Sequence, residues 1–359
     1  MINLDDKKTV LETQGGDKVL RSINNFPKQI QQAFLESQKI SYPKKYRKVK
    51  NLVVAGMGGS RFPALIIKEL FKNYLTIPFI INDDYIVPEF VNHETLYILS
   101  SYSGTTEEVL INGKTAYKKG ALLTGLSSGG DLQIFLNKIA APLYVYNPIY
   151  NPSGQPRIGF GYAFGGLLGI LVNLGLIKID KIMINQAIKK LPLLMTDFFI
   201  ENPLKKNPAK ILAKKIFQKY PYFIVAEFLT GIGNGMANQI NETAKAISSF
   251  RIIPELNHHL MEGLKFPEVL KKIAVFIFFY SVFYSPQIKK RFYITEEVVK
   301  KNNIETFWYQ LKGGNILEQA LELMAFGNFL SMYLAALYQQ DPTTIPYVDY
   351  FKKKLKKMK

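Results

Sequence analysis

The sequence predicts an α/β protein of two doubly wound domains, each a parallel sheet flanked by helices. Short apolar segments alternate with longer polar or helical segments in both halves of the chain, which is the pattern of parallel strands joined by crossover helices. The chain has 359 residues, of which 48% are hydrophobic, so it is long enough for two cores. We place the domains at residues 1–195 and 196–359, the second with a C-terminal helical tail.

The expected strands fall into two groups. In the first half they are residues 52–55, 79–82, 96–100, 121–126 and 143–146. In the second half they are residues 222–226, 252–254, 274–283 and 306–309, with long helices around residues 316–339. Each group suits one parallel sheet, and the proline- and lysine-bearing stretch 202–208 is the predicted link between the domains.

Two uncharged segments, 159–177 and 323–340, approach the length of a transmembrane helix. Glycines and polar residues interrupt them, and the mean hydropathy of the whole chain is +0.01. We therefore expect buried helices packed against a sheet or a partner subunit, and no membrane association. The chain has no cysteine, which excludes disulfides, and its first residues do not form a secretory signal. A cytoplasmic location is expected.

The formal net charge is +18, which would also suit a protein that binds nucleic acid. The basic residues are mostly spread along the chain, apart from short clusters at 44–48 and 352–359, and no RNA-binding signature is present. We therefore expect no nucleic-acid partner. A basic protein also attracts small anionic substrates, and the charge is compatible with that use.

Two turns predict a phosphate site. Residues 99–108 place the hydroxyls of Ser101, Ser103 and Thr106 where an apolar strand gives way to a helix. The turn after the first strand has three glycines, with Gly59 directly before Ser60 at the opening of the next helix. Hydroxyls and backbone N–H groups at helix N-termini suit a phosphate monoester. The alternative is that Ser103 or a neighbouring threonine only caps its helix.

At these motifs the chain resembles the sugar isomerase (SIS) domains, and among them the two-domain bifunctional phosphoglucose/phosphomannose isomerases. The resemblance covers most of the chain, with its motifs in the family's order: 58–60, 101–108, 155–157 with 161–162, 239–245, 255–258 and 348–352. It implies two SIS-type domains, and an enzyme that converts glucose 6-phosphate to fructose 6-phosphate through an enediolate without metal or organic cofactor. Whether mannose 6-phosphate is also accepted is left open.

The resemblance also implies the site residues. Glu242 is the base that moves the proton, Arg157 stabilises the enediolate, and His258 and Lys352 assist opening of the sugar ring. In related enzymes the histidine comes from the partner subunit, which implies a homodimer with the active site at its interface. Gly59, Ser60, Ser101, Ser103 and Thr106 are assigned to the substrate phosphate.

Each of these residues has a plainer interpretation. Glu242 and Lys245 are spaced as an ordinary helical pair, Arg157 suits a salt bridge at a helix entrance, and Lys352 lies in a lysine-rich tail. His258 and His259 suggest a metal, but no third ligand stands at a recognisable spacing, so we expect no metal site.

The chain also departs from the family pattern. His259 and Leu260 replace the usual continuation after the histidine, residues 235–237 replace a basic and aromatic cluster, and Thr105 stands where asparagine is usual. Two other functions therefore stay open. One is a sugar-phosphate sensor that binds without chemistry, and the other is an isomerase of another phosphosugar.

Overall fold

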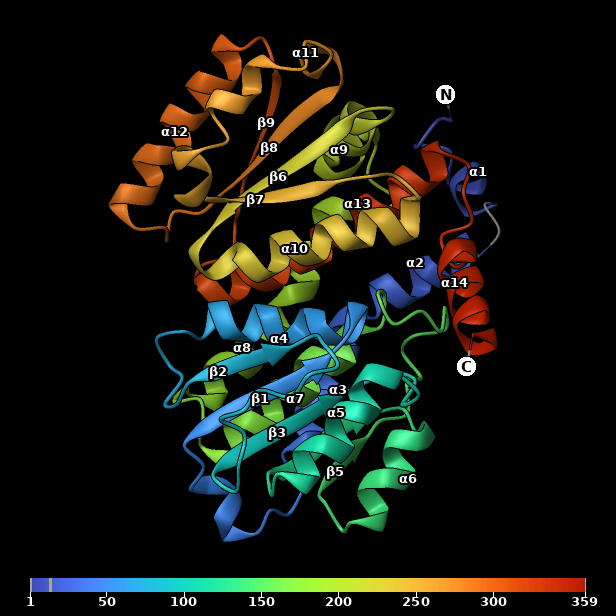
Figure 1. The fold of residues 1–359 in the computed structure, drawn as a ribbon. Coiled ribbons are helices and arrows are strands. Elements are labelled where there is room, and N and C mark those ends of the chain that lie inside the picture. Colours follow the sequence, from blue (N-terminus) through green and yellow to red (C-terminus); the bar gives the residue numbers. More distant parts are fainter. Residues whose placement is uncertain (1, 13–14, 359) are drawn as a thin grey trace.

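Two parallel β-sheets, one in each half of the chain, form the framework of the computed structural model, which describes residues 2–12 and 15–358. The first sheet has the strand order β2-β1-β3-β4-β5, and the second has the order β7-β6-β8-β9. The sheets lie one above the other in Figure 1, with α4, α10 and α13 between them. The predicted fold class is confirmed.

The strands are β1 (Asn51–Gly56), β2 (Phe79–Asn82), β3 (Thr95–Ser100), β4 (Leu122–Ser127), β5 (Leu143–Val145), β6 (Tyr220–Ala226), β7 (Ser249–Ile253), β8 (Ala274–Tyr280) and β9 (Glu305–Gln310). The helices are α1 (Lys7–Leu11), α2 (Gly16–Asn24), α3 (Phe26–Ser37), α4 (Gly58–Leu70), α5 (Glu107–Lys118), α6 (Gly130–Lys138), α7 (Phe160–Leu174), α8 (Lys181–Met195), α9 (Pro208–Ile216), α10 (Thr230–Gln239), α11 (Leu270–Ile273), α12 (Pro286–Lys301), α13 (Ile316–Leu337) and α14 (Pro346–Lys357).

The first sheet is apolar on both faces, as a doubly wound sheet requires. Along β1, Leu52 and Val54 face the large core that α3, α7 and the second half of the chain complete. The intervening Val53 and Ala55 face a smaller core with residues of α5 and α6. Alternate side chains of one strand thus enter two cores, because successive residues of a strand point to opposite faces.

Every predicted strand segment overlaps a strand, but some bounds were wrong. The segment 274–283 was too long, because β8 ends at Tyr280 and the chain turns there. Ser281 donates to the side chain of Gln319, and Phe283 beyond it is 42% exposed. Similarly, β7 begins at Ser249 and leaves out Pro254. Apolar residues in an exposed turn produced the first error, since an apolar pattern alone does not distinguish them from strand residues.

The predicted domain boundary coincides with the end of α8 at Met195, and the division itself stays a prediction. The segment proposed as the link is anchored at its end, although Lys205 and Lys206 within it are exposed. Asn207 is buried, and its side chain accepts from the backbone at the start of α9. Lys210 is also buried and donates to the carbonyl of Ile200 and the carboxylate of Asp5. The two halves are therefore connected by an ordered stretch of chain.

The uncharged segments that approach transmembrane length form buried helices. α13 is long and apolar enough to cross a membrane, but its apolar window lies wholly inside the fold, as for a core helix. In α7, Gly165 lies against the backbone of Ile30 and Gly169 against Phe34 and Ser37 of α3. The glycines that made this segment unusual therefore allow two helices to approach closely.

A second pair of glycines lies where the two halves of the chain pack against each other. Gly231 and Gly235 stand one turn apart on α10 and face α4. A Cβ at Gly231 would lie 2.6 Å from backbone atoms of Leu65 and Ile66, and one at Gly235 would overlap the ring of Phe62. α4 and α10 can therefore approach closely between the sheets only because Gly231 and Gly235 have no side chain.

Because the atoms facing Gly231 are backbone, they cannot move aside cheaply. We expect Gly231→Val to destabilise the fold by about 2 kcal/mol or more, despite the better helix propensity of valine. The measurement is the free energy of unfolding from urea titration. The control is Gly263→Val, because nothing lies within 4 Å of a Cβ built at Gly263. Equal stability of the two variants would contradict this account.

Candidate active site

The two predicted phosphate turns lie side by side at the carboxyl edge of the first sheet. Gly56, the last residue of β1, pairs in register with Ser100, the last residue of β3. The hydroxyl of Ser100 donates to the carbonyl of Ser60 (2.9 Å), and the Ser60 hydroxyl accepts from the backbone N–H of Tyr102 (2.9 Å). The two turns therefore form one unit, where ligands of open parallel sheets bind.

The second turn is held by its own hydroxyls. Ser101 and Thr106 share a hydrogen bond of 2.7 Å, and Ser101 also accepts from the N–H of Gly104 (3.1 Å). Ser103 accepts from the N–H of Thr105 (3.2 Å). The N-cap of α5 is Thr106, and its side chain makes no capping hydrogen bond. The hydrogen-bond partners of Ser103 are Thr105 Oγ1 and the N–H of Thr105, so its hydroxyl is used within the turn. A helix N-terminus at this position favours an anion.

The carboxyl edge of the second sheet is different, because backbone N–H groups there already donate hydrogen bonds to carboxylates of the chain itself. Glu227, directly after β6, accepts from Ser285 at the start of α12 (3.2 Å). Glu322 accepts from the N–H groups of Lys312 (2.8 Å) and Gly313 (2.9 Å), which follow β9. These amides have internal anionic partners, so the first sheet is the better place for a substrate phosphate.

Arg157 is almost completely buried, with 2% of its surface exposed. Its guanidinium lies 3.5 Å from the carboxylate of Glu242. It donates to Thr243 Oγ1 (3.2 Å), Gln155 Oε1 (2.9 Å), Pro342 O (2.6 Å) and Thr343 O (3.0 Å). Burial lowers the pKa of Arg157, and the charge of Glu242 opposes this shift. The salt bridge of the plainer interpretation is therefore present, and its partner is the residue expected to be the catalytic base.

The loop that carries Arg157 is fixed to the phosphate turns. A Cβ at Gly59 would lie 3.1 Å from the backbone nitrogen of Arg157, so the glycine allows this contact. The side-chain amide of Asn151 donates to the hydroxyl of Tyr102 (2.7 Å) and to the carbonyl of Gln155 (3.1 Å). The hydroxyl turn and the arginine are thus positioned relative to each other.

Glu242 lies in a π-helical turn, Ile240–Ala244, that follows α10. Its side chain is 33% exposed, so it remains open to a ligand. Burial raises its pKa, and the positive charges of Arg157, Lys352 and Lys245 oppose this effect. A carboxyl group with a raised pKa at an accessible position suits a general base. Lys245 is not paired with Glu242 along a helix. The π-helical turn ends at Ala244, and Lys245 itself has a left-handed backbone (φ 56°).

The structure brings only one of the two ring-opening residues to Glu242. Lys352, on the exposed helix α14, lies close enough for its charge to act on the carboxylate. His258 is exposed in the 3-10 turn Glu255–His258 beyond β7, and it is not among the groups that act on Glu242. His259 next to it pairs with Glu255 at 3.6 Å. Residues 2–12 and 15–358 contain no cluster of three potential metal ligands.

Sequence reasoning missed several residues of this site. Lys245 and Gln239 belong to the motif around Glu242, but neither received a role. Gln239 donates to the carbonyl of Arg157 (2.9 Å) and to Asn328 of α13 (2.8 Å). In the turn 341–343, Thr343 or Thr344 was considered only as a small polar group near the site for mannose 6-phosphate, and the contact of this turn with the guanidinium was not expected. Its role follows only from its position in the fold.

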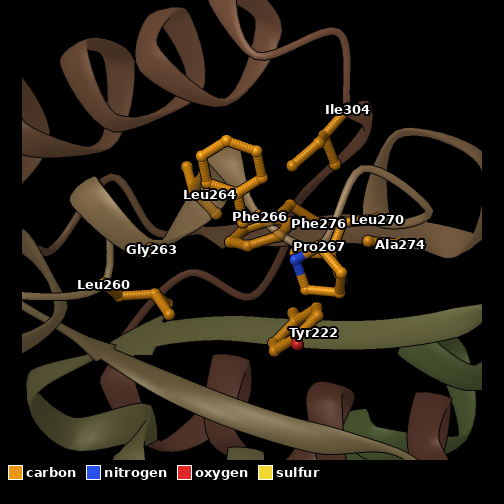
Figure 2. Close-up of a pocket in the computed structure, with 10 residues that line it drawn as sticks. All are labelled: Tyr222, Leu260, Gly263, Leu264, Phe266, Pro267, Leu270, Ala274, Phe276 and Ile304. Carbon is orange, nitrogen blue, oxygen red and sulfur yellow. The ribbon is translucent and has the colours of Figure 1, made fainter.

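An apolar cavity of about 230 Å³ lies elsewhere, beneath the segment that follows β7 (Figure 2). Tyr222, Ala274 and Phe276 line it near the amino ends of β6 and β8, and Leu264 and Phe266 cover it. It contains no catalytic candidate and lies at the opposite end of these strands from their ligand-binding edge. We therefore do not assign the reaction to it.

Comparison with known proteins relates the chain to one family of enzymes. Residues 205–355 match the family described as the bacterial phospho-glucose isomerase C-terminal SIS domain. The chain is 32% identical to a bifunctional phosphoglucose/phosphomannose isomerase of Caldicellulosiruptor bescii, over 95% of this chain and 100% of that one. It is 27% identical to the enzyme of the same name from Aquifex aeolicus, over 86% of this chain and 91% of the relative.

A solved structure, of a hypothetical protein from Thermus thermophilus, has a similar fold. Its TM-score is 0.73 at 14% identity, and the match covers 95% of this chain and 90% of that one. The match to the Caldicellulosiruptor bescii enzyme covers nearly the whole of both chains. The chain belongs to the family of bifunctional phosphoglucose/phosphomannose isomerases.

Proposed function

We propose that the protein interconverts glucose 6-phosphate and fructose 6-phosphate by proton transfer through an enediolate. The observation that carries the proposal is the pairing of buried Arg157 with accessible Glu242, fixed beside the hydroxyl turns. A base and a cation at one end of a phosphate site are what this isomerisation needs. The relatives named for both glucose and mannose phosphates support it.

The roles follow from chemistry. Ser60, Ser101, Ser103 and Thr106, with the backbone at Gly59, bind the phosphate at the N-termini of α4 and α5. In the open-chain sugar, Glu242 takes the proton from carbon 2 of the aldose and returns it to carbon 1. Arg157 stabilises the negative charge that develops on the enediolate oxygen. The oxygen at carbon 2 loses its hydroxyl proton and the oxygen at carbon 1 gains one, so atoms and electrons balance within the sugar and no redox cofactor is needed.

His258 and Lys352 act on the sugar ring before this step. Opening the ring requires a proton at the ring oxygen and removal of one from the hydroxyl at carbon 1, and both side chains can exchange protons. Because His258 is exposed and is not among the groups that act on Glu242 in its own chain, it serves the site of a partner subunit in a homodimer. The protein acts in the cytoplasm, where sugar phosphates are metabolised.

The first test is a coupled assay with glucose 6-phosphate and mannose 6-phosphate offered separately. We expect Glu242→Gln to lower kcat by about 10²–10⁴-fold, because the amide cannot take the proton, while KM changes little. Glu69→Gln, a similar change of a half-buried residue of α4, is the control. Undiminished turnover in Glu242→Gln would exclude this base. Tight sugar-phosphate binding by a wild type without turnover would identify a sensor, and turnover of another phosphosugar alone would change the substrate.

The pH dependence tests the same carboxyl group. Because burial raises the pKa of Glu242, the base becomes protonated at a higher pH than an ordinary glutamate, and kcat falls as the pH drops through that value. We expect the acid limb of kcat above about pH 4.3, the ordinary value. The measurement is kcat, since kcat/KM also reports the substrate phosphate, which ionises near pH 6. An acid limb below the ordinary value would contradict the assignment.

The shared site can be tested by complementation. Glu242→Gln and His258→Ala chains should each be inactive alone. Co-expression forms heterodimers in which one site combines an intact Glu242 with an intact His258 of the other chain. We expect about one quarter of wild-type activity from random pairing, because half of the dimers have one intact site of two. If His258 served its own chain, the mixture would stay inactive.

A further inference from the structure

Lys245 has an unusual backbone and a specific pair of partners. Its φ of 56° lies in the left-handed region, which costs free energy for a residue with a side chain. The half-buried side chain turns back so that Nζ donates to the carbonyl of Thr243 (3.2 Å) and to the carbonyl of Asp341. These carbonyls belong to the turn that carries Glu242 and to the chain that follows α13.

The chain at residues 341–343 also holds Arg157. The guanidinium donates to the carbonyls of Pro342 (2.6 Å) and Thr343 (3.0 Å), directly after the carbonyl that Lys245 binds. The carboxylate of Asp341 accepts from the N–H (2.7 Å) and the hydroxyl (2.6 Å) of Thr343, which closes the turn. Three successive carbonyls of one short turn therefore accept from two cations.

We propose that Lys245 is a positioning residue for the proposed isomerase reaction: by joining the carbonyls of Thr243 and Asp341, it fixes the turn that holds Arg157 against Glu242. The inference rests on the proposed function, since its purpose is to hold the cation where the enediolate charge develops. In this proposal Lys245 acts through Arg157 and not by contact with the substrate. A displacement of the guanidinium by about 1 Å can cost 10²-fold in rate, so the position of this turn has a direct catalytic consequence.

The charges around Lys245 support this role. Burial and the nearby charge of Arg157 lower the pKa of Lys245 to about 8, whereas Asp341 and Glu242 oppose the shift. Lys352 acts on the same Glu242 from α14. With its pKa lowered, Lys245 is charged at neutral pH and loses the charge as the pH rises through about 8. Above that pH the neutral amine binds the carbonyls of Thr243 and Asp341 less strongly, so the turn that holds Arg157 is less firmly fixed and kcat should fall.

Three variants separate positioning from other roles. Lys245→Met removes the donors and the charge, and Lys245→Gly does the same while favouring the observed backbone conformation, so it should fold. We expect both to lower kcat by about 10–100-fold and to change KM by less than about threefold. Lys245→Arg keeps the donors and the charge, and it should keep most of the activity and lose the alkaline limb near pH 8.

The control is Lys290→Met, which removes one positive charge from an exposed position on α12. Thermal unfolding shows whether each variant is folded. A purely structural role would lower the amount of folded enzyme without changing the pH profile of the remainder. Wild-type kcat and an unchanged alkaline limb in folded Lys245→Met or Lys245→Gly would overturn the proposal.

A crystal structure of Lys245→Met tests this inference independently of the proposed function, because it measures the position of Arg157 and not the activity. If the wild type does not isomerise hexose phosphates, the proposed function fails, but the position of Arg157 can still be measured. Movement of the guanidinium away from the carbonyls of Pro342 and Thr343 would support the positioning role. An unmoved guanidinium would overturn it, whatever the substrate is.

Discussion

The buried guanidinium of Arg157 is the interaction on which the rest of the site depends. A charged group removed from water is stable only when its hydrogen bonds are satisfied, and removing a partner from a buried ion pair typically costs about 3–5 kcal/mol. Arg157 meets this demand with partners from three separate parts of the chain: its own loop, the turn after α10 and the turn after α13. The need to satisfy one cation thus draws these segments together around Glu242.

The two sheets show how one topology can be used in two ways. In each, a central strand is followed by a helix that faces the other half of the chain, and the close contact of α4 with α10 sets the spacing between the sheets. The first sheet presents hydroxyls at its ligand edge, whereas the second uses glutamates to satisfy its own backbone N–H groups. The topology therefore does not determine binding, and the side chains at the edge decide it.

The proposed phosphate ligands are neutral hydroxyls and backbone groups, and the fixed cations lie around Glu242 instead. This division suits the reaction, because a phosphate bears the same charge in substrate and transition state, whereas the enediolate oxygen gains charge only during the reaction. If the reacting carbons lie beside Glu242, as we propose, these cations stabilise the transition state selectively. The net charge of +18 supplies a general attraction for the phosphate without using a buried cation.

The sequence by itself determined the features that depend on near neighbours. Strand segments, the α/β class, the hydroxyl turns and the motif around Glu242 are all visible within about ten residues, because side-chain alternation and helix-start signals are local. Only the tertiary structure decided which partners the charged side chains have. The partners of Arg157 at Pro342 and Thr343 are 185 and 186 residues away, the lysine in the Glu242 motif binds a distant carbonyl, and the glutamates of the second sheet close its edge. A charged side chain becomes functional through burial and through the groups that folding brings to it, and no local pattern encodes either.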